Sequence, residues 1–430
     1  MSRITVFPSK KITGEISVDG DKSITHRAIM HAGLATGTSS VTHFLNGNDC
    51  QATINCMRGM GVEIVEENEQ LTITGHGLNG LKQPSKSLDC GRSGTTMRLL
   101  MGLLCGMDQK KFVLDGDTQL QKRPMERVAK PLRKFGATIN TSNGTAPVEI
   151  IGTQLHGKEI KLDVPSAQVK SALIYAGLYA QGNTVITQFA PTRDHTERML
   201  SAQGVSIVRD VYSVKVTPTQ KLAPIEMVIP GDISSAAFPI AAAVISPQAE
   251  LTIRDVGLND SRTGLIDILV RMGAKIKIDV IDKQAIEPIG NLFIQDSALN
   301  AIELGGDMIV RAIDEIPLVA LLATQANGKT VIRDAAELRV KETDRIQSIS
   351  EELNKLGAQI EATPDGMIIQ GPTPLKGTLV DSHGDHRIAM ALFIAGCIAD
   401  GQTTINHFEC VTDSFPGFTD IMASIGALYE

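Results

Sequence analysis

The sequence predicts an α/β (α+β) fold of two domains, each built from three copies of one repeated unit. A glycine-centred phrase occurs six times at intervals of roughly 70 residues, and such a fixed period indicates a repeat architecture. Each interval also opens with a short strand, a polar turn and an apolar helix. The expected unit is therefore strand, helix, strand, helix, strand, strand, and 430 residues are enough for two or three cores.

The repeated phrase predicts a junction between a helix and a strand. Its central residues are Gly61, Gly136, Gly204, Gly273, Gly357 and Gly426. Glycine adopts the left-handed conformation that often closes a helix, and the β-branched residues that commonly follow it favour extended backbone. We therefore expect each unit to pass from a helix into a strand at this glycine.

Each unit opens on a polar turn that precedes a largely apolar helix. The openings are residues 16–23, 88–95, 162–168, 227–235, 312–317 and 380–387. A helix without a wide polar face, such as 172–178, is expected inside a domain. Its first turn presents unpaired N–H groups and the positive end of the helix dipole, which suit anions. Serine and aspartate there are also ordinary caps, but several of these turns carry cations that capping does not require.

Composition excludes several classes of function. The formal net charge of −7 argues against a nucleic-acid binder, which usually carries a basic excess. Aromatic residues make up only 3% of the chain, which leaves few side chains for base stacking. An anionic partner must therefore be bound by a local cluster of cations.

Cysteine spacing and hydropathy favour a cytoplasmic protein. The six cysteines show no CxxC spacing and mostly lie in apolar surroundings, so reduced thiols are expected. The first residues lack the apolar core of a signal peptide. The longest apolar run, residues 389–399, is shorter than the roughly 20 residues of a membrane span, and we expect no membrane association.

Two charged regions are candidates for chemistry. Lys22 stands at a helix start, with Arg27 about one turn later; a cation there is unfavourable by about 0.3–1 kcal/mol, which a bound anion offsets. The densely charged stretch 337–345 reads as a solvated helix face or as part of a site. With Asp314, Glu342 in this stretch suits paired base and acid roles.

The turn at residues 383–387 is a possible metal site, because it holds His383, Asp385 and His386. Arg387 in the same turn would repel a cation, and no third cluster of ligands is evident. We therefore expect no metal.

Eight motifs occur in one order along the whole chain. They are residues 21–23 with Arg27, 91–98, 123–125, 166–173, 192–197, 313–317, 339–345 and 385–387. This set resembles that of the enolpyruvyl transferase family of 3-phosphoshikimate 1-carboxyvinyltransferases, or EPSP synthases.

The resemblance implies an inside-out α/β barrel arrangement, with the helices buried and the two domains hinged around a cleft. The N-terminal domain would span 16–225 and bind shikimate 3-phosphate. The C-terminal domain would combine 1–15 with 226–430 and carry the acid, the base and the phosphoenolpyruvate (PEP) arginines. A cytoplasmic monomer without metal or organic cofactor is implied.

The resemblance also implies a reaction and its residues. The enolpyruvyl group of PEP would pass to the 5-hydroxyl of shikimate 3-phosphate by addition and elimination, a step of chorismate and aromatic amino-acid biosynthesis. Asp314 would take the hydroxyl proton, Glu342 would protonate the PEP methylene, and Lys22 would lie between the substrates. Shikimate 3-phosphate would contact Lys22, Ser23, Arg27, Ser166, Ala167, Gln168, Arg193, Asp314 and Lys341. PEP would contact Lys22, Gly94, Arg123, Gln168, Arg345 and Arg387.

These motifs concentrate positive charge that the chain as a whole lacks. Two catalytic carboxylates stand against six cations, which are Lys22, Arg27, Arg123, Lys341, Arg345 and Arg387. The two substrates carry carboxylates and phosphates, so a local positive excess suits them.

Three positions depart from the usual pattern of the family. Arg92 stands where Asn is usual, which affects the PEP geometry near Gly94. Ala167 replaces a Ser common in part of the family, and Arg193 is a candidate to replace its phosphate contact. Asp413 stands in a segment where many members have Lys. The last departure suggests the subclass that is less sensitive to glyphosate.

Two alternatives remain. The sister enzyme that acts on UDP-N-acetylglucosamine normally carries a Cys in a Gly-rich loop, and the corresponding residues 114–121 contain none. A non-catalytic repeat scaffold would explain six units. It would not explain cations at the starts of buried helices, or Asp314 with Glu342.

Overall fold

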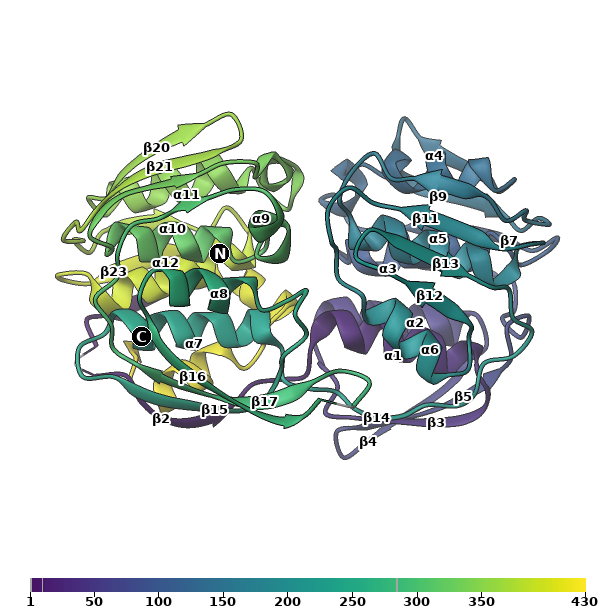
Figure 1. Ribbon diagram of the computed structural model, residues 1–430, viewed down its shortest axis with the longest axis horizontal. Coiled ribbons are helices and arrows are strands. Elements are labelled where there is room, and N and C mark those ends of the chain that lie inside the picture. Colours follow the sequence, from purple (N-terminus) through teal and green to yellow (C-terminus); the bar gives the residue numbers. More distant parts are fainter. Residues whose placement is uncertain (1, 10, 284) are drawn as a thin grey trace. The chain divides into compact units, whose positions relative to one another are not determined.

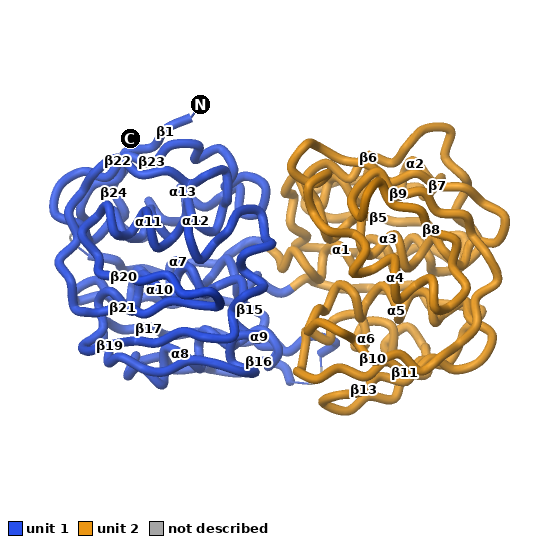
Figure 2. Tube along the Cα trace, turned by 90° about the horizontal axis from the view of Figure 1, so that it is seen from above, with its two compact units in different colours: residues 1–19, 230–430 blue, residues 20–229 orange. Residues whose placement is uncertain are grey.

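The computed structural model describes residues 2–9, 11–283 and 285–430. The chain forms two compact units (Figure 2). Unit 1 comprises Met1–Asp19 and Pro230–Glu430, and unit 2 comprises Gly20–Ile229. Both boundaries lie a few residues later than the expected 15/16 and 225/226.

Unit 2 contains three four-stranded sheets and the helices that pack on them (Figure 1). The sheet orders are β14-β3-β5-β4, β6-β7-β9-β8 and β10-β11-β13-β12. The strands are β3 (Thr36–Thr42), β4 (Glu63–Glu67), β5 (Gln70–His76), β6 (Leu88–Asp89), β7 (Lys111–Asp115), β8 (Thr138–Ser142), β9 (Thr145–Ile151), β10 (Glu159–Lys161), β11 (Thr184–Thr187), β12 (Ile207–Arg209), β13 (Ser213–Val216) and β14 (Glu226–Val228). The helices are α1 (Lys22–Leu34), α2 (Asn48–Gly59), α3 (Gly94–Leu104), the short η1 (Leu120–Lys122), α4 (Glu126–Lys134), α5 (Ala167–Tyr179) and α6 (His195–Ala202).

Unit 1 repeats this plan with the sheets β2-β15-β17-β16, β18-β19-β21-β20 and β22-β23-β1-β24. Its strands are β1 (Arg3–Phe7), β2 (Thr13–Ser17), β15 (Glu250–Gly257), β16 (Lys275–Asp282), β17 (Ile289–Gln295), β18 (Glu303–Leu304), β19 (Gly328–Ile332), β20 (Gln359–Thr363), β21 (Gly366–Gly371), β22 (Leu379–Asp381), β23 (Thr403–Asn406) and β24 (Leu428–Tyr429). Its helices are α7 (Ile233–Ile245), α8 (Gly264–Arg271), α9 (Asp307–Arg311), α10 (Ile316–Thr324), η2 (Ala336–Val340), α11 (Arg345–Lys355), α12 (His386–Ile398), η3 (Phe408–Asp413) and α13 (Phe418–Ser424).

The six sheets share one pairing pattern. The opening strand of each sheet runs parallel to its neighbour, and the remaining pairs are antiparallel. A parallel pair requires a crossover, and the helix after the opening strand supplies it where that strand belongs to the same repeat. The strands and helices therefore follow one another along the chain in the predicted order. Three strands, however, pair outside the repeat that their position in the sequence suggests.

Two opening strands belong to a different unit from the helix that follows each of them. β2 precedes α1 in the chain, but it pairs with β15 of unit 1, with Ile16 opposite Ile253. β14 precedes α7, but it pairs with β3 of unit 2, with Met227 opposite Val41. Ile16 belongs to the buried core of unit 1, and this burial explains why residues 16–19 belong there.

The third strand out of order is β1. It pairs with both β23 and β24, with Arg3 opposite Asn406 and Phe7 opposite Leu428. The N-terminal strand therefore completes the sheet of the last repeat, as the resemblance implies.

The helices that follow the opening strands form the interior of each unit. α1, α3 and α5 are buried along most of their length in unit 2, and α7, α10 and α12 in unit 1. The predicted buried helices are thus confirmed. The six junction glycines all have φ between +86° and +108°, which confirms the predicted helix ends.

The cysteines and the lengths of the apolar helices were the basis of two further expectations. All six cysteines are buried thiols. Among the helices of residues 2–9, 11–283 and 285–430, none has both the length and the apolarity required to cross a membrane.

Candidate active site

The three interior helices of unit 2 begin with capped turns. Asp21 accepts a hydrogen bond from the N–H of Ile24 (2.9 Å) at the start of α1. Ser93 caps α3 and Ser166 caps α5 in the same way. The capping interpretation of these polar turns is therefore correct, and Ser166, a predicted substrate contact, also caps its helix.

Arg27 is buried on α1 and is held by uncharged groups. Its Nε donates to Thr196 Oγ1 (2.7 Å), one Nη donates to the carbonyl oxygen of Ser23 (2.8 Å), and the other to Ser171 Oγ (2.9 Å). Burial lowers the pKa of Arg27 below its ordinary value, and the nearby cation Arg193 acts in the same direction. These hydroxyl and carbonyl partners orient the guanidinium without cancelling its charge.

Lys22, the first residue of α1, forms an ion pair with Asp49 at the start of α2. The distance from Nζ to the carboxylate is 3.2 Å, and both side chains are largely buried. The sequence analysis missed Asp49, because an aspartate in the first turn of a helix is common.

Gly94, at the start of α3, allows Arg123 to approach closely. A Cβ at position 94 would lie 2.9 Å from Nη1 and 3.1 Å from Cζ of Arg123. Such contacts are too short for a side chain, so this approach requires glycine. Arg123 follows η1, and α4 begins three residues later, at Glu126.

Gln168 connects α5 to α3. Its Oε1 accepts a hydrogen bond from Arg98 (2.7 Å), and its Nε2 donates to Thr95 Oγ1 (3.0 Å). Arg98 also donates to the carbonyl oxygen of Pro124 (3.2 Å). This network links the helix starts that carry Gly94, Gln168 and the Arg123 loop.

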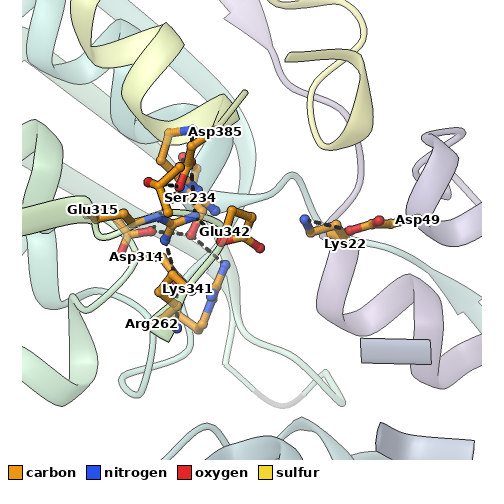
Figure 3. A network of polar contacts seen from close by, with 12 residues as sticks. Lys22, Asp49, Ser234, Arg262, Asp314, Glu315, Lys341, Glu342 and Asp385 are labelled. Atoms are coloured by element: carbon orange, nitrogen blue, oxygen red, sulfur yellow. Dashed lines mark hydrogen bonds and ion pairs between the residues drawn. The ribbon is translucent and has the colours of Figure 1, made fainter. Parts of the chain in front are cut away.

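In unit 1, Asp314 lies between two cations (Figure 3). One carboxylate oxygen is 3.3 Å from Lys341 Nζ and 3.3 Å from a terminal nitrogen of Arg345. Asp314 precedes α10, whereas Lys341 follows η2 and Arg345 begins α11. The fold therefore brings together residues about thirty positions apart.

Arg345 is buried and paired with three carboxylates. Its Nε and one Nη bind Asp385 (2.7 and 3.2 Å), the same Nη binds Glu342 (2.7 Å), and the other Nη reaches Asp314. Burial disfavours the charged guanidinium, but the charges of Asp385, Glu342 and Asp314 outweigh it and raise the pKa of Arg345. The charged stretch 337–345 is thus not one helix face, because it runs from η2 through a loop to the first residue of α11.

Arg387 lies in the first turn of α12, where one Nη donates to the carbonyl oxygen of Ser234 (3.3 Å) and to Glu315 (3.4 Å). Its guanidinium carbon lies 5.9 Å from the ring centroid of Phe238. Glu315 directly follows Asp314, so the two adjacent carboxylates contact different cations.

The turn considered as a metal site is used differently. Asp385 binds Arg345 (2.7 Å) and also caps α12 through the N–H of Arg387. Within the described residues, three His, Cys, Asp or Glu side chains lie close enough to share a metal ion only at Glu351, Glu352 and His383. Glu352 already binds Lys355 (2.8 Å).

The predicted residues thus fall into two groups, one in each unit. The unit 2 half-site consists of Lys22, Ser23, Arg27, Gly94, Arg123, Ser166, Ala167, Gln168 and Arg193. The unit 1 half-site consists of Asp314, Lys341, Glu342, Arg345 and Arg387.

Comparisons with known proteins show the family of the chain. Residues 6–422 match the family model described as EPSP synthase (3-phosphoshikimate 1-carboxyvinyltransferase). The chain belongs to the EPSP synthase family.

Individual EPSP synthases match over nearly the full length. The 3-phosphoshikimate 1-carboxyvinyltransferase of Bacillus cereus (strain B4264) is 49% identical over 423 residues, which cover 98% of each chain. That of Bacillus thuringiensis subsp. konkukian (strain 97-27) is 49% identical over 421 residues, covering 97% of this chain and 98% of the relative. A solved EPSP synthase of Acinetobacter baumannii has a TM-score of 0.89 and 42% identity, covering 100% of this chain and 99% of that one.

The structure explains one departure from the usual EPSP synthase pattern. Arg92 lies 3.6 Å from Asp117 and donates a hydrogen bond to Gln119, in the segment that leads to Arg123. Its charge is therefore balanced by Asp117, which lies in the loop between β7 and η1. Ala167 is the first residue of α5, and Asp413 ends η3.

Proposed function

We propose that the unit 2 half-site binds shikimate 3-phosphate and that the unit 1 half-site supplies the acid and the base. The family reaction transfers the enolpyruvyl group of PEP to the 5-hydroxyl of shikimate 3-phosphate and gives 5-enolpyruvylshikimate 3-phosphate and phosphate. The observation that carries the proposal is the cluster of Asp314, Lys341, Glu342 and Arg345, which the fold assembles from two separate motifs.

Shikimate 3-phosphate requires a site that stays positively charged. Arg27 meets this requirement because its protein partners are neutral oxygens. Arg193 adds a second cation close to Arg27, where it can take over the contact that Ala167 lacks. Ser166 and Gln168 provide polar contacts at the start of α5, and Lys22 and Ser23 do so at the start of α1.

Asp314 acts as the base in this proposal. Its carboxylate accepts the proton of the 5-hydroxyl as the hydroxyl oxygen attacks C2 of PEP. Lys341 and Arg345, each 3.3 Å from one oxygen, keep the carboxylate oriented. A positioned base of this kind commonly contributes about 10²–10⁴-fold to the rate.

Glu342 acts as the acid. It donates a proton to C3 of PEP, which turns the methylene into a methyl group and leaves an electron-poor C2 for the hydroxyl oxygen. In the second step C3 returns a proton to Glu342, the C2–O bond to the phosphate breaks, and the double bond is restored. The proton held by Asp314 leaves with the phosphate, so both carboxyl groups regain their starting states. Lys22 stabilises the negative charge that develops on the phosphate oxygens.

Several cations contact PEP in this proposal. The residues assigned to PEP are Lys22, Gly94, Arg123, Gln168, Arg345 and Arg387. All three nitrogens of Arg345 already bind carboxylates. Arg345 must therefore give up at least one of these contacts when it binds PEP. Arginine suits these contacts because its planar fork matches carboxylate and phosphate.

Measurement of phosphate release from PEP tests the function. The purified protein should release phosphate with shikimate 3-phosphate and not with UDP-N-acetylglucosamine. Release only with UDP-N-acetylglucosamine would assign the chain to the sister activity. No release with either substrate would favour the scaffold alternative.

We also propose a cytoplasmic monomer that needs no metal or organic cofactor. Activity should survive dialysis against EDTA, and light scattering during gel filtration should give a mass near 46.0 kDa. Loss of activity that added Mg²⁺ restores, or a mass of twice that value, would contradict this part.

The segment around Asp413 suggests weak inhibition by glyphosate. A lysine in that segment would attract the anionic inhibitor, whereas an aspartate repels it. Inhibition constants measured against PEP should therefore be high. Strong competition of glyphosate with PEP would refute this expectation.

A further inference from the structure

A network of buried polar side chains in unit 1 includes Arg262, Ser234 and Glu315 (Figure 3). Arg262, in the loop before α8, donates through one Nη to Asp232 (2.9 Å) and to Ser234 Oγ (2.7 Å). Ser234 Oγ in turn donates to Glu315, which binds Arg387 (3.4 Å). The network therefore runs from Arg262 through Ser234 and Glu315 to Arg387.

The members of this network are almost completely buried. The side chains of Arg262 and Asp232 are 4% and 5% exposed, and those of Arg387 and Glu315 are 7% and 4% exposed. Buried charges are retained only where they are paired. In this polar network, Asp232 pairs with Arg262 and Glu315 pairs with Arg387.

Only one terminal nitrogen of the Arg387 guanidinium is bound by the protein within the described residues. Both of its hydrogen bonds, to the carbonyl oxygen of Ser234 and to Glu315, come from the same Nη. Across the described residues, the Nε and the second Nη of Arg387 donate to no protein acceptor. These two groups form the edge of a guanidinium that binds a carboxylate or phosphate through two parallel hydrogen bonds.

We propose that Glu315, supported by Ser234 and Arg262, is a positioning residue that fixes Arg387 for PEP. Glu315 does not touch the substrate in this account. It binds one terminal nitrogen of the guanidinium and leaves the Nε and the other terminal nitrogen for the anion. The inference rests on the proposed function, because it assumes that Arg387 binds PEP.

Arg345 differs from Arg387 in the number of carboxylates that bind it. Its three nitrogens all bind carboxylates of Asp314, Glu342 and Asp385, so an incoming anion must compete with them. Arg387 has one carboxylate partner and keeps an edge for the ligand. Of these two arginines, Arg387 is therefore the one already arranged for an anion.

The test is steady-state kinetics of Glu315→Gln with both substrates varied. The amide keeps the shape of the side chain but loses the charge that orients Arg387. We expect the KM for PEP to rise about tenfold, the worth of one charge-assisted hydrogen bond, and the KM for shikimate 3-phosphate to stay within about twofold. The kcat should fall less than the KM for PEP rises.

Ser234→Ala provides a second variant with little change in volume. It cuts the link between Arg262 and Glu315 but leaves the Asp232 contact of Arg262. The KM for PEP should rise by a smaller factor than in Glu315→Gln. The double variant should resemble Glu315→Gln alone, because residues of one network are not additive.

Glu352→Gln is the matched control. Glu352 is also buried, lies in unit 1 and binds a cation, Lys355, but it has no contact with Arg387. It should lower the melting temperature without raising the KM for PEP. An equal rise of that KM in Glu352→Gln would mean that any buried charge loss has this effect, and the inference would be wrong.

The two proposals fail in different ways. An active wild-type enzyme whose Glu315→Gln variant keeps the wild-type KM for PEP would overturn the positioning role only. A wild-type enzyme that releases no phosphate with shikimate 3-phosphate would overturn the proposed function, and the inference with it.

Discussion

The two half-sites hold their arginines with different partners. In unit 2, Arg27 binds two hydroxyl groups and a carbonyl oxygen, and Arg98 binds an amide and a carbonyl oxygen. In unit 1, Arg345 binds three carboxylates, and Arg387 binds a fourth. Neutral partners orient a cation and preserve its charge, whereas carboxylates orient it and cancel the charge.

This difference suits unit 2 to the binding of an anionic substrate and unit 1 to proton transfer. A phosphate is attracted to the half-site whose charge is preserved. Carboxylates that must accept and donate protons need cations nearby to orient them, and unit 1 provides these. The contrast predicts that loss of the acid or the base in unit 1 lowers turnover, whereas loss of Arg27 in unit 2 lowers the affinity for shikimate 3-phosphate.

Loss of the proposed acid should have the largest effect. Glu342→Gln removes the proton donor and keeps the side-chain shape, so kcat should fall by about 10²–10⁴-fold. The KM for shikimate 3-phosphate should change little, because that substrate is assigned to unit 2. Stopped or continuous phosphate-release assays measure both values. Wild-type turnover in this variant would remove Glu342 from its role.

The same substitution at two arginines should have different costs in stability. Arg345→Gln leaves Asp385, whose side chain is 0% exposed, without its cation, and should lower the free energy of unfolding by about 3–5 kcal/mol. Arg27→Gln leaves only neutral acceptors and should cost about 1–3 kcal/mol. Denaturant titration of both variants measures the difference. Equal costs would contradict the contrast between the half-sites.

Unit 2 also contains a buried imidazole that makes stability depend on pH. Burial lowers the pKa of His31 from 6.5 to about 3, although its hydrogen bond with Gln203 acts in the opposite direction. Between these values His31 binds a proton in the unfolded chain but not in the folded chain. This residue alone should therefore make stability fall as the pH drops below 6.5, by about 1.4 kcal/mol per pH unit.

His31→Gln should make this dependence shallower over pH 5–6.5, even if the variant is less stable at pH 7. Urea titrations at several pH values measure the slope. The exposed His76 gives a control, since His76→Gln should leave the slope unchanged. An unchanged slope in His31→Gln would contradict the assignment.

Arg92 should have the smallest effect. Its charge is balanced by Asp117, and the pair is partly exposed, so it contributes about 1 kcal/mol or less. Arg92→Asn should therefore change the KM for PEP by only about two- to fivefold. Steady-state kinetics would show a larger change if Arg92 contacted PEP directly.

The repeat and the interior helices could be predicted because they depend on local patterns. The junction glycines and the apolar helices such as α5 appear within a few residues of sequence. The exchange of β2 and β14 could not be predicted, because each strand precedes a helix of the other unit. A strand's partner depends on distant residues, such as Ile253 opposite Ile16, and not on its own sequence.

The cations of the site were easier to predict than their partners. A lysine or arginine at the start of a buried helix is unusual and attracts attention. An aspartate there resembles a helix cap, and Asp385 is both a cap and the partner of Arg345. Asp49 of unit 2 and Glu315 and Asp385 of unit 1 were therefore missing from the charge balance, which overestimated the positive excess in both units.

Binding of shikimate 3-phosphate in the absence of PEP tests the central claim most directly. Calorimetric titration should give similar dissociation constants for the wild-type enzyme and Glu342→Gln, within about threefold, and a constant at least about tenfold weaker for Arg27→Gln. The account would be contradicted if Glu342→Gln lost the ligand and Arg27→Gln bound it as tightly as the wild type.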